Sequence, residues 1–282
     1  MLCSDFEYNN QRLSDYGCMV CNITSNSGIE TKNIGNKITF DTVDFQGNNN
    51  TGKFRLLNTS YEERFSTSFE ICKYDCNDLD NRFFSDEETT KIVRWLNQKK
   101  FHKFRMIYSD SQYPMVYYNG SFNVELLTLN ENVIGMLLNF ESDAPFGYYE
   151  QAEFHMDFSD PDNEFALYDT SDETGYLYPD ELTIRILEDG DLTVCNSLDK
   201  CNVVVNNCKS GELITLDGRH KIIRSNMAHE NLYNDFNYNF LKVINNNDEN
   251  TDEYDCKKNI YSAALKCKIN LSYSPIAKVG VI

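Results

Sequence analysis

Two closely spaced pairs of cysteines are the residues of this chain best suited to metal chemistry. Cys18 and Cys21 form a Cys-x-x-Cys pair, and Cys72 and Cys76 form a Cys-x-x-x-Cys pair. Four thiolates from two such pairs can complete a tetrahedral zinc site. Cys18 and Cys21, however, lie in the alternating run 16–23, and residues three apart point to opposite faces of a strand. We therefore expect these cysteines to be small apolar fillers of strands and predict no zinc site.

A cluster of acidic side chains in the second half of the chain is the other candidate for binding a cation. Oxygen ligands of this kind suit calcium, and the cluster consists of Asp157, Asp160, Asp162, Asn163 and Glu164. The order of residues lacks the Asp-x-Asp-x-Asn-Gly pattern of a calcium loop and its glutamate at position 12. We interpret the cluster as an exposed acidic loop, and we predict that the protein holds neither a metal ion nor another cofactor.

The sequence contains no arrangement that is typical of catalysis. The four histidines, at positions 102, 155, 220 and 229, have no Glu-x-x-His or His-x-x-x-His companion. No serine occupies a Gly-x-Ser-x-Gly turn, no local signature supports a Cys/His nucleophilic pair, and no glycine-rich phosphate loop is present. A cell-wall hydrolase would bring paired carboxylates or a Cys/His signature. We therefore predict no catalytic residues and no enzyme activity.

Charge and hydropathy argue against two classes of partner. The 282-residue chain has 26 Lys and Arg against 44 Asp and Glu, a net charge of −18, so it offers no basic field to nucleic-acid phosphates. The longest apolar stretch, 133–138, is far shorter than the ~18 residues of a membrane span. The acidic start of the chain lacks the basic region of a signal peptide. We expect the protein to be made in the cytoplasm, where its 10 cysteines stay reduced.

A change in composition near the middle of the chain indicates two domains. Most of the net negative charge lies after residue 140, and the change coincides with the polar segment 141–147, which contains Pro145 and Gly147. Pro and Gly in a polar segment are typical of a boundary between domains. We predict a first domain over residues 1–147 and a second domain over residues 148–282.

Alternating apolar residues predict that both domains are mainly β. In the first domain a turn at Asn119-Gly120 precedes one strand, and the alternating runs are 16–23, 67–71, 104–108, 122–126 and 133–140. In the second domain Asp217-Gly218 is a hairpin signal, and the runs are 182–187, 192–195, 202–205, 213–216, 221–224 and 265–273. Short strands at this spacing predict an antiparallel sandwich. The Asn-rich, acidic segment 245–255 is expected to be an exposed loop.

One helix is predicted in the first domain, which is therefore of the α+β class. Ser85 and Glu88 form a capping box at its start, and the helix is expected to run over 86–98. Spacings of three and four residues give it one apolar face, made of Ile92, Trp95 and Leu96. This face is suited either to packing on the sheet of its own chain or to a contact between subunits.

A protruding hairpin is predicted between residues 38 and 57. Two short apolar runs, 38–45 and 54–57, flank the turn segment Gly47 to Asn50. A hairpin of this length has too few apolar residues to bury by itself and usually packs against something else, here a neighbouring copy of the chain. The predicted interface residues are Ile38, Phe40, Val43, Phe45, Phe54 and Leu56.

The order of motifs along the chain resembles that of phage distal tail proteins. The opening segment 6–17, Phe-Glu-Tyr-Asn-Asn-Gln-Arg-Leu-Ser-Asp-Tyr-Gly, is similar to the start of that family, with Asn10 in place of the usual glycine. Further motifs in the family's order are Ile92–Leu96, Phe104–Asp110, Tyr117–Gly120, Leu137–Phe146, Gly211–Gly218 and Lys268–Pro275. The Gly-x-Asn that usually precedes the last strand is missing.

The resemblance implies a fold, an assembly and a set of partners. The fold would be an N-terminal β-sandwich with one helix and a protruding hairpin, followed by a C-terminal galectin-like antiparallel β-sandwich. The family forms a homohexameric ring at the end of the tail, a hub that connects the tail tube to the baseplate or tail-fibre proteins. The implied partners are the chain itself, the tail tube protein, the tape measure and the tail-associated or baseplate hub proteins, and the implied location is the virion.

An alternative interpretation gives the C-terminal domain a binding function. It would then be a carbohydrate-binding module that recognises a glycan of the host cell surface. Sugar rings stack on aromatic side chains, and the candidates in this domain are Tyr176, Tyr178 and Tyr233, with Tyr238 and Tyr261 as further tyrosines. The same tyrosines are also compatible with roles in the core or on a solvated surface.

Overall fold

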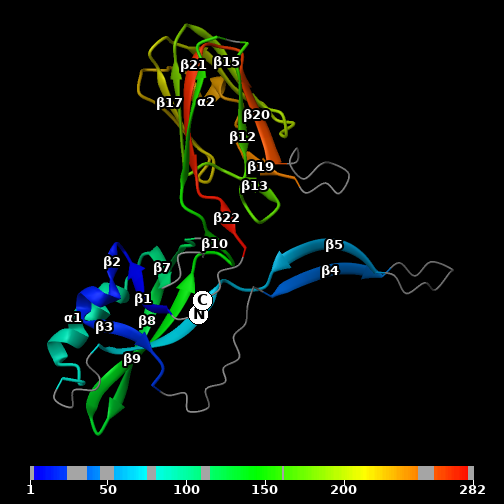
Figure 1. The fold of residues 1–282 in the computed structure, drawn as a ribbon. Helices are drawn as coiled ribbons and strands as arrows, with labels where there is room; N and C mark the ends of the chain where they lie inside the picture. Colours follow the sequence, from blue (N-terminus) through cyan, green and yellow to red (C-terminus); the bar gives the residue numbers. More distant parts are fainter. Residues whose placement is uncertain are drawn as a thin grey trace. The chain divides into compact units, whose positions relative to one another are not determined.

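A computed structural model describes residues 3–23, 37–44, 54–74, 81–108, 115–160, 162–246 and 257–278 (Figure 1). The chain forms two compact units, residues 1–148 with 278–282, and residues 149–277. Antiparallel sheets dominate both units, and the predicted mainly-β class is confirmed.

The first unit is built on one seven-stranded antiparallel sheet with the strand order β2-β1-β7-β8-β9-β6-β3. The strands are β1 (Cys3–Tyr8), β2 (Gln11–Arg12), β3 (Cys18–Cys21), β6 (Ser66–Lys73), β7 (His102–Tyr108), β8 (Tyr118–Leu129) and β9 (Asn132–Ser142). The short strand β10 (Gly147–Tyr148) ends the unit. β3 lies at one end of this order and β1 lies next to the other end, and yet the two strands contact each other, so the sheet curls over its own core.

The core of the first unit is aromatic. Phe6, Phe104, Phe122 and Phe140 are at most 1% exposed and come from four different strands. Their rings contact one another at centroid distances of 4.5–5.7 Å. Burial of rings of this size dominates the stability of such a core.

The helix α1 (Asp86–Leu96) closes this core and is held by the predicted cap. Ser85 Oγ accepts a hydrogen bond from the Glu88 amide at 3.3 Å, and Glu88 Oε2 accepts one from the Ser85 amide at 2.8 Å. Ile92, Trp95 and Leu96 are at most 5% exposed and belong to the core of their own unit. Of the two roles open to this apolar face, packing on its own sheet is therefore correct.

A separate two-stranded sheet contains β4 (Ile38–Asp44) and β5 (Phe54–Tyr61), which pair antiparallel with a bulge between Asp41 and Thr42. β5 is longer than the run 54–57 that the sequence indicated. At the base of the hairpin, the Glu62 amide donates to the Lys37 carbonyl oxygen at 2.9 Å. This hairpin pairs with no third strand in the part of the chain that the structure describes.

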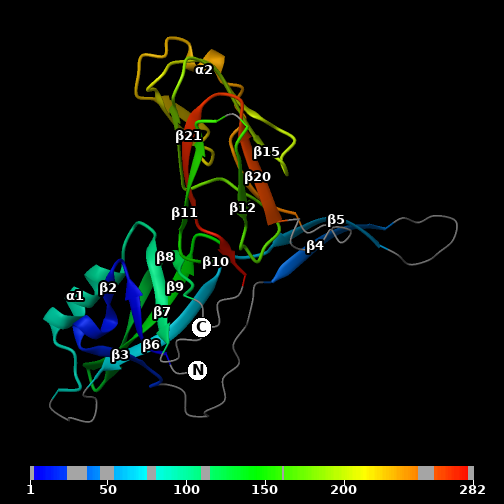
Figure 2. The ribbon, with the colours of Figure 1, turned by 45° about the horizontal axis from the view of Figure 1, so that its top comes forward.

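The second unit is an antiparallel sandwich of two sheets (Figure 2). The five-stranded sheet contains β11 (Ala152–Phe158), β21 (Cys267–Tyr273), β14 (Glu181–Ile186), β17 (Leu213–Asp217) and β18 (Ile222–Ser225). The four-stranded sheet contains β12 (Glu164–Tyr168), β20 (Lys258–Ala263), β15 (Gly190–Asn196) and β16 (Val203–Cys208). One apolar cluster draws on both sheets. The remaining elements are β13 (Gly175–Leu177), β19 (Val243–Asn245), β22 (Ile276–Ala277) and the short helix α2 (Leu232–Asp235).

Three local predictions were wrong. Tyr16, at the start of the run 16–23, lies in a 3-10 helix (Leu13–Tyr16), and β3 begins only at Cys18. Asn119-Gly120 is not a turn but part of β8. Asn245 is not in an exposed loop: it ends β19, is 4% exposed, and donates through Nδ2 to the carbonyl oxygens of Ser171 and Glu173. Residues 247–255 of that predicted loop lie outside the described residues.

The Asp217-Gly218 hairpin is confirmed with a longer turn than a two-residue loop. Asp217 pairs with Ile222, so four residues connect β17 to β18. Lys221 in this turn has a φ of 59°, a left-handed conformation that is uncommon for a residue with a side chain.

Candidate functional site

The cysteine pairs are packed into strands. β3 pairs with β6 so that Cys18 lies opposite Lys73 and Met19 lies opposite Cys72, and both cysteines are buried. Burial raises the pKa of Cys18 to about 12, and the neighbouring Cys72 adds to this rise. A thiol with this pKa is protonated at neutral pH. Cys76 lies outside the described residues.

The acidic cluster in the second unit makes separate local contacts. Asp157 forms an ion pair with Lys268 at 2.9 Å, and its hydrogen bond with Lys268, together with those from Ser159, lowers the pKa of Asp157 to about 2. Asp160 Oδ1 accepts a hydrogen bond from the Asp162 amide at 3.2 Å. Among the described residues, no group of three or more His, Cys, Asp or Glu side chains is arranged to hold a metal ion.

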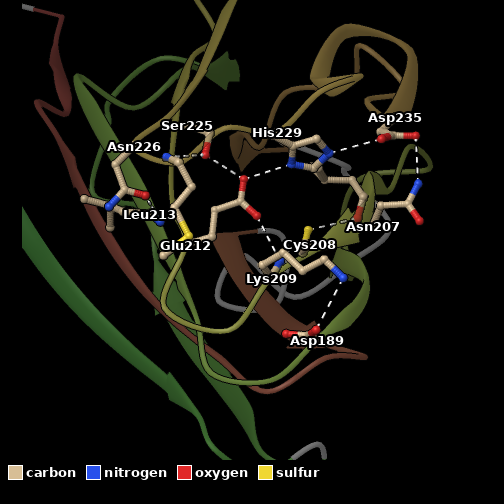
Figure 3. Close-up of polar contacts among 12 residues, drawn as sticks. Asp189, Asn207, Cys208, Lys209, Glu212, Leu213, Ser225, Asn226, His229 and Asp235 are labelled. Atoms are coloured by element: carbon tan, nitrogen blue, oxygen red, sulfur yellow. Dashed lines mark hydrogen bonds and ion pairs between the residues drawn. The ribbon is translucent and has the colours of Figure 1, made fainter.

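His229 is the histidine of the second unit whose two ring nitrogens both contact carboxylates, and no motif in the sequence indicates it. Its side chain is 5% exposed. Figure 3 shows its imidazole between two carboxylates: Nδ1 lies 2.9 Å from Glu212 Oε1, and Nε2 lies 3.1 Å from Asp235 Oδ2. The other histidines of the second unit make single polar contacts, His155 with Asn270 and His220 with Asp217.

The predicted interface residues of the hairpin are exposed where the structure describes their side chains. The exposed fraction is 38% for Ile38, 62% for Phe40, 38% for Val43 and 52% for Leu56. Phe45 lies outside the described residues. Phe54 is placed only by its backbone, opposite Asp44.

The strand register assigns these residues to the two faces of the hairpin. Alternate residues of a strand share a face, so Ile38, Phe40 and Thr42 lie on one face of β4. Leu56 pairs with Thr42 and lies on the same face, whereas Val43 lies on the opposite face. Ile38, Phe40 and Leu56 thus form an exposed apolar surface, which we call the hairpin face.

The candidate sugar-binding tyrosines are in different places. The rings of Tyr176 and Tyr178 meet edge to face at 5.5 Å, and Tyr176 is 60% exposed. The ammonium of Lys242 lies 5.2 Å from the Tyr176 ring, and that of Lys221 lies 3.8 Å from the Tyr178 ring. Tyr233 is exposed on α2.

The two further tyrosines of the second unit differ in exposure. Tyr238 is exposed, whereas Tyr261 is fully buried. The hydroxyl of Tyr261 donates to the Lys242 carbonyl oxygen at 2.8 Å. Tyr261 therefore belongs to the core of the sandwich, which is one of the roles that the sequence left open for these tyrosines.

Comparison with known families covers nearly the whole chain. Residues 1–144 match the family described as phage tail protein N-terminal domain, and residues 146–273 match the one described as phage tail C-terminal domain. The chain belongs to this family of phage tail proteins. It is a structural component of the tail and thus of the virion.

A solved structure shares the fold of this phage tail protein. The crystal structure of SPP1 Dit, described as a paradigm of the hub of the adsorption apparatus in phages that infect Gram-positive bacteria, aligns with a TM-score of 0.59. The alignment covers 97% of this chain and 99% of SPP1 Dit, at 10% sequence identity. No curated protein matches the chain. None of the described helices is long and apolar enough to cross a membrane.

Proposed function

We propose that this phage tail protein forms a homohexameric ring, the distal tail hub that connects the tail tube to the baseplate or tail-fibre proteins. Its first unit makes the ring, and its second unit decorates the outside. The fold shared with SPP1 Dit supports this assignment, and so does the family membership. The partners are then the tail tube protein, the tape measure and the baseplate hub proteins, and the role requires no catalytic group.

The observation that carries the proposal is the exposed hairpin face. Phe40 and Leu56 are 62% and 52% exposed on a sheet of only two described strands, and an isolated two-stranded hairpin is marginally stable in water. Burying each such side chain stabilises a contact by about 1.5–3 kcal/mol. When a face of one subunit docks on a different surface of the next subunit, the contact is head-to-tail. Repeating such contacts closes a ring if the rotation from each subunit to the next is a whole fraction of a full turn.

We expect a charge on the hairpin face to break the ring. Phe40→Asp and Leu56→Asp would each place a carboxylate in the buried contact, which costs several kcal/mol unless the charge is paired. Native mass spectrometry of the wild-type protein should give a species of six 32.8 kDa chains, whereas both variants should give mainly single chains.

The matched control is Ser60→Asp. Ser60 is exposed and pairs with Thr39, on the face opposite Phe40, so this variant adds the same charge to the same hairpin and should still form the ring. Far-UV circular dichroism checks that all variants fold. A wild-type protein that stays monomeric at high concentration, or a Phe40→Asp variant that stays hexameric, would contradict the proposed assembly.

A second candidate function is glycan recognition by the second unit, and it rests on the tyrosine pair. Tyr176 presents most of its ring to solvent beside Tyr178, and an aromatic face with few rotatable bonds is a suitable platform for a sugar ring. Tyr261 contributes nothing to such a site, since it is buried.

A glycan array probed with the full chain tests this candidate. If the pair binds sugar, we expect Tyr176→Ala to weaken the affinity by about five- to 150-fold, since stacking of one ring is worth about 1–3 kcal/mol in comparable aromatic contacts. Tyr233→Ala, at an exposed tyrosine elsewhere in the second unit, serves as the comparison. Absence of any glycan signal above background would remove this function and would leave the hub assignment untouched.

A further inference from the structure

The cluster around His229 ties three parts of the second unit together. Glu212 precedes β17, His229 follows β18, and Asp235 is the last residue of α2. The Glu212 carboxylate is 1% exposed and accepts hydrogen bonds from Ser225 Oγ at 2.6 Å, from the Lys209 amide at 3.0 Å and from His229 Nδ1 at 2.9 Å. The imidazole therefore connects a rigid, buried carboxylate on one side to the helix α2 on the other (Figure 3).

Both nitrogens of the ring face acceptors, and this fixes its protonation. An ionised carboxylate can only accept hydrogen bonds, and a neutral imidazole has a single N–H. The two contacts are therefore both hydrogen bonds only when His229 is an imidazolium. Burial lowers the pKa of His229, but the hydrogen bonds and charges of Glu212 and Asp235 outweigh this effect and raise it above the ordinary value.

The other ionisable groups near the cluster have contacts of their own and do not take over the role of His229. Cys208 on β16 is buried, and burial together with the Glu212 charge raises its pKa to about 12, so it stays a thiol. Lys209 directs its ammonium to Asp189 at 3.3 Å. Asp191 on β15 accepts a hydrogen bond from the Asn207 amide at 2.8 Å. His229 is thus the group of this cluster whose charge changes near neutral pH.

The two carboxylates differ in how costly it is for them to lose their hydrogen bond with the imidazole. Glu212 is enclosed and holds three donors, so loss of the Nδ1 proton would leave a buried charge partly unsatisfied. Asp235 is 17% exposed and has Asn207 Nδ2 on its other oxygen at 3.1 Å. The neutral ring therefore keeps its Nδ1 proton, and the lone pair of Nε2 then faces Asp235 Oδ2.

We propose that His229 is a pH-dependent latch that fastens α2 to the sandwich when it is protonated and releases it when it is neutral. The released segment carries Tyr233, and release is local because Leu232 and Phe236, on either side of it, are 9% and 3% exposed and belong to the apolar core, and because Phe236 pairs with Val205. The sign follows from linkage. The stabilisation is fully present below the unfolded-state pKa of about 6.5 and is lost as pH rises through the raised pKa of the folded state.

Hydrogen exchange of the full-length protein, read in peptides that cover residues 231–236, tests the latch. The amides of Asn234 and Asp235 both donate to the Asn231 carbonyl oxygen and report the opening of α2. After correction for intrinsic exchange, their protection should fall by up to tenfold for each pH unit between the open-state pKa of about 6.5 and the raised pKa of the folded state, because opening releases one proton in that range, and it should be constant above it. Peptides from β14 should show no such slope.

The matched variant is Asp235→Asn. Its side-chain amide would donate to the neutral Nε2 while its oxygen still accepts from Asn207, so α2 should stay fastened and the pH slope should vanish. His220→Asn removes an exposed histidine that pairs with Asp217 and should leave the slope unchanged. A flat profile in the wild-type protein, or the same slope in Asp235→Asn, would overturn the latch.

The ring proton is measured independently of any variant. Nitrogen NMR of ¹⁵N-histidine-labelled wild-type protein should show an imidazolium at pH 6 for His229 and, at high pH, a neutral ring with the proton on Nδ1. A neutral ring with its proton on Nε2, or a His229 that is neutral at pH 6, would also overturn the proposal.

Discussion

Replacing Trp95 by alanine is expected to lower the free energy of unfolding of the first unit by about 3–5 kcal/mol. Trp95 is 5% exposed, and its ring stacks on Tyr16 at 4.5 Å and on Phe6 at 5.6 Å. Its Nε1 donates to the Tyr8 carbonyl oxygen at 2.9 Å. The substitution therefore removes two stacked contacts, leaves a cavity and takes the indole N–H away from the carbonyl oxygen of Tyr8.

The urea dependence of hydrogen exchange in β7 and β8 measures this effect, because it reports on the first unit alone. Trp95→Phe keeps an aromatic ring but loses the N–H, and we expect it to cost less than the alanine variant, about 1–3 kcal/mol. Thr90→Ala, at an exposed position of the same helix, should stay within about 0.5 kcal/mol. A loss below 1 kcal/mol for Trp95→Ala would show that the helix does not close the core.

Replacing Gly120 by alanine is expected to lower the free energy of unfolding of the first unit by about 3 kcal/mol or more, at the upper end of the range for overpacking. Gly120 lies inside β8, between His102 of β7 and Ser142 of β9. A Cβ at this position would overlap the carbonyl oxygen of Glu141 and the ring of Phe140. Since one of these obstacles is backbone, two paired strands would have to move apart, and overpacking of this kind strains the whole sheet.

A second substitution separates the two obstacles. In the Gly120→Ala protein, Phe140→Leu would remove the clash with the ring and keep the clash with the Glu141 backbone, so we expect little recovery. Asn123→Ala, at an exposed position of the same strand, is the control for an alanine in β8 whose Cβ is exposed to solvent. Unfolding in urea is the measurement, and near-native stability of Gly120→Ala would mean that β8 and β9 are farther apart than described.

Elements that are determined by local chemistry could be predicted from the sequence. The helix α1 has its whole start signal within Ser85 to Glu88 and ends at Leu96, two residues before the predicted end. The exposure of Ile38 and Phe40 on β4 could also be predicted, because the hairpin has too few apolar residues to bury them itself. In the helix the stabilising contacts lie within a few residues of one another along the chain. In the hairpin the two paired strands follow one another directly in the order of elements.

Contacts between distant segments account for the errors. Asn119-Gly120 has the sequence of a turn, yet Gly120 is a glycine because β9 passes too close for a side chain. Asn245 has the composition of a loop, yet its side chain bonds to backbone atoms more than 70 residues earlier. The His229 cluster joins positions 212, 229 and 235 at spacings that correspond to no motif, so no local signal could reveal it.

The two outer edges of the β4–β5 hairpin pair with no further strand among the described residues. Strand edges of this kind recruit other strands. Subunits that have not yet joined a tail would therefore associate with one another through these edges, so premature self-association is the hazard that this hairpin brings to assembly.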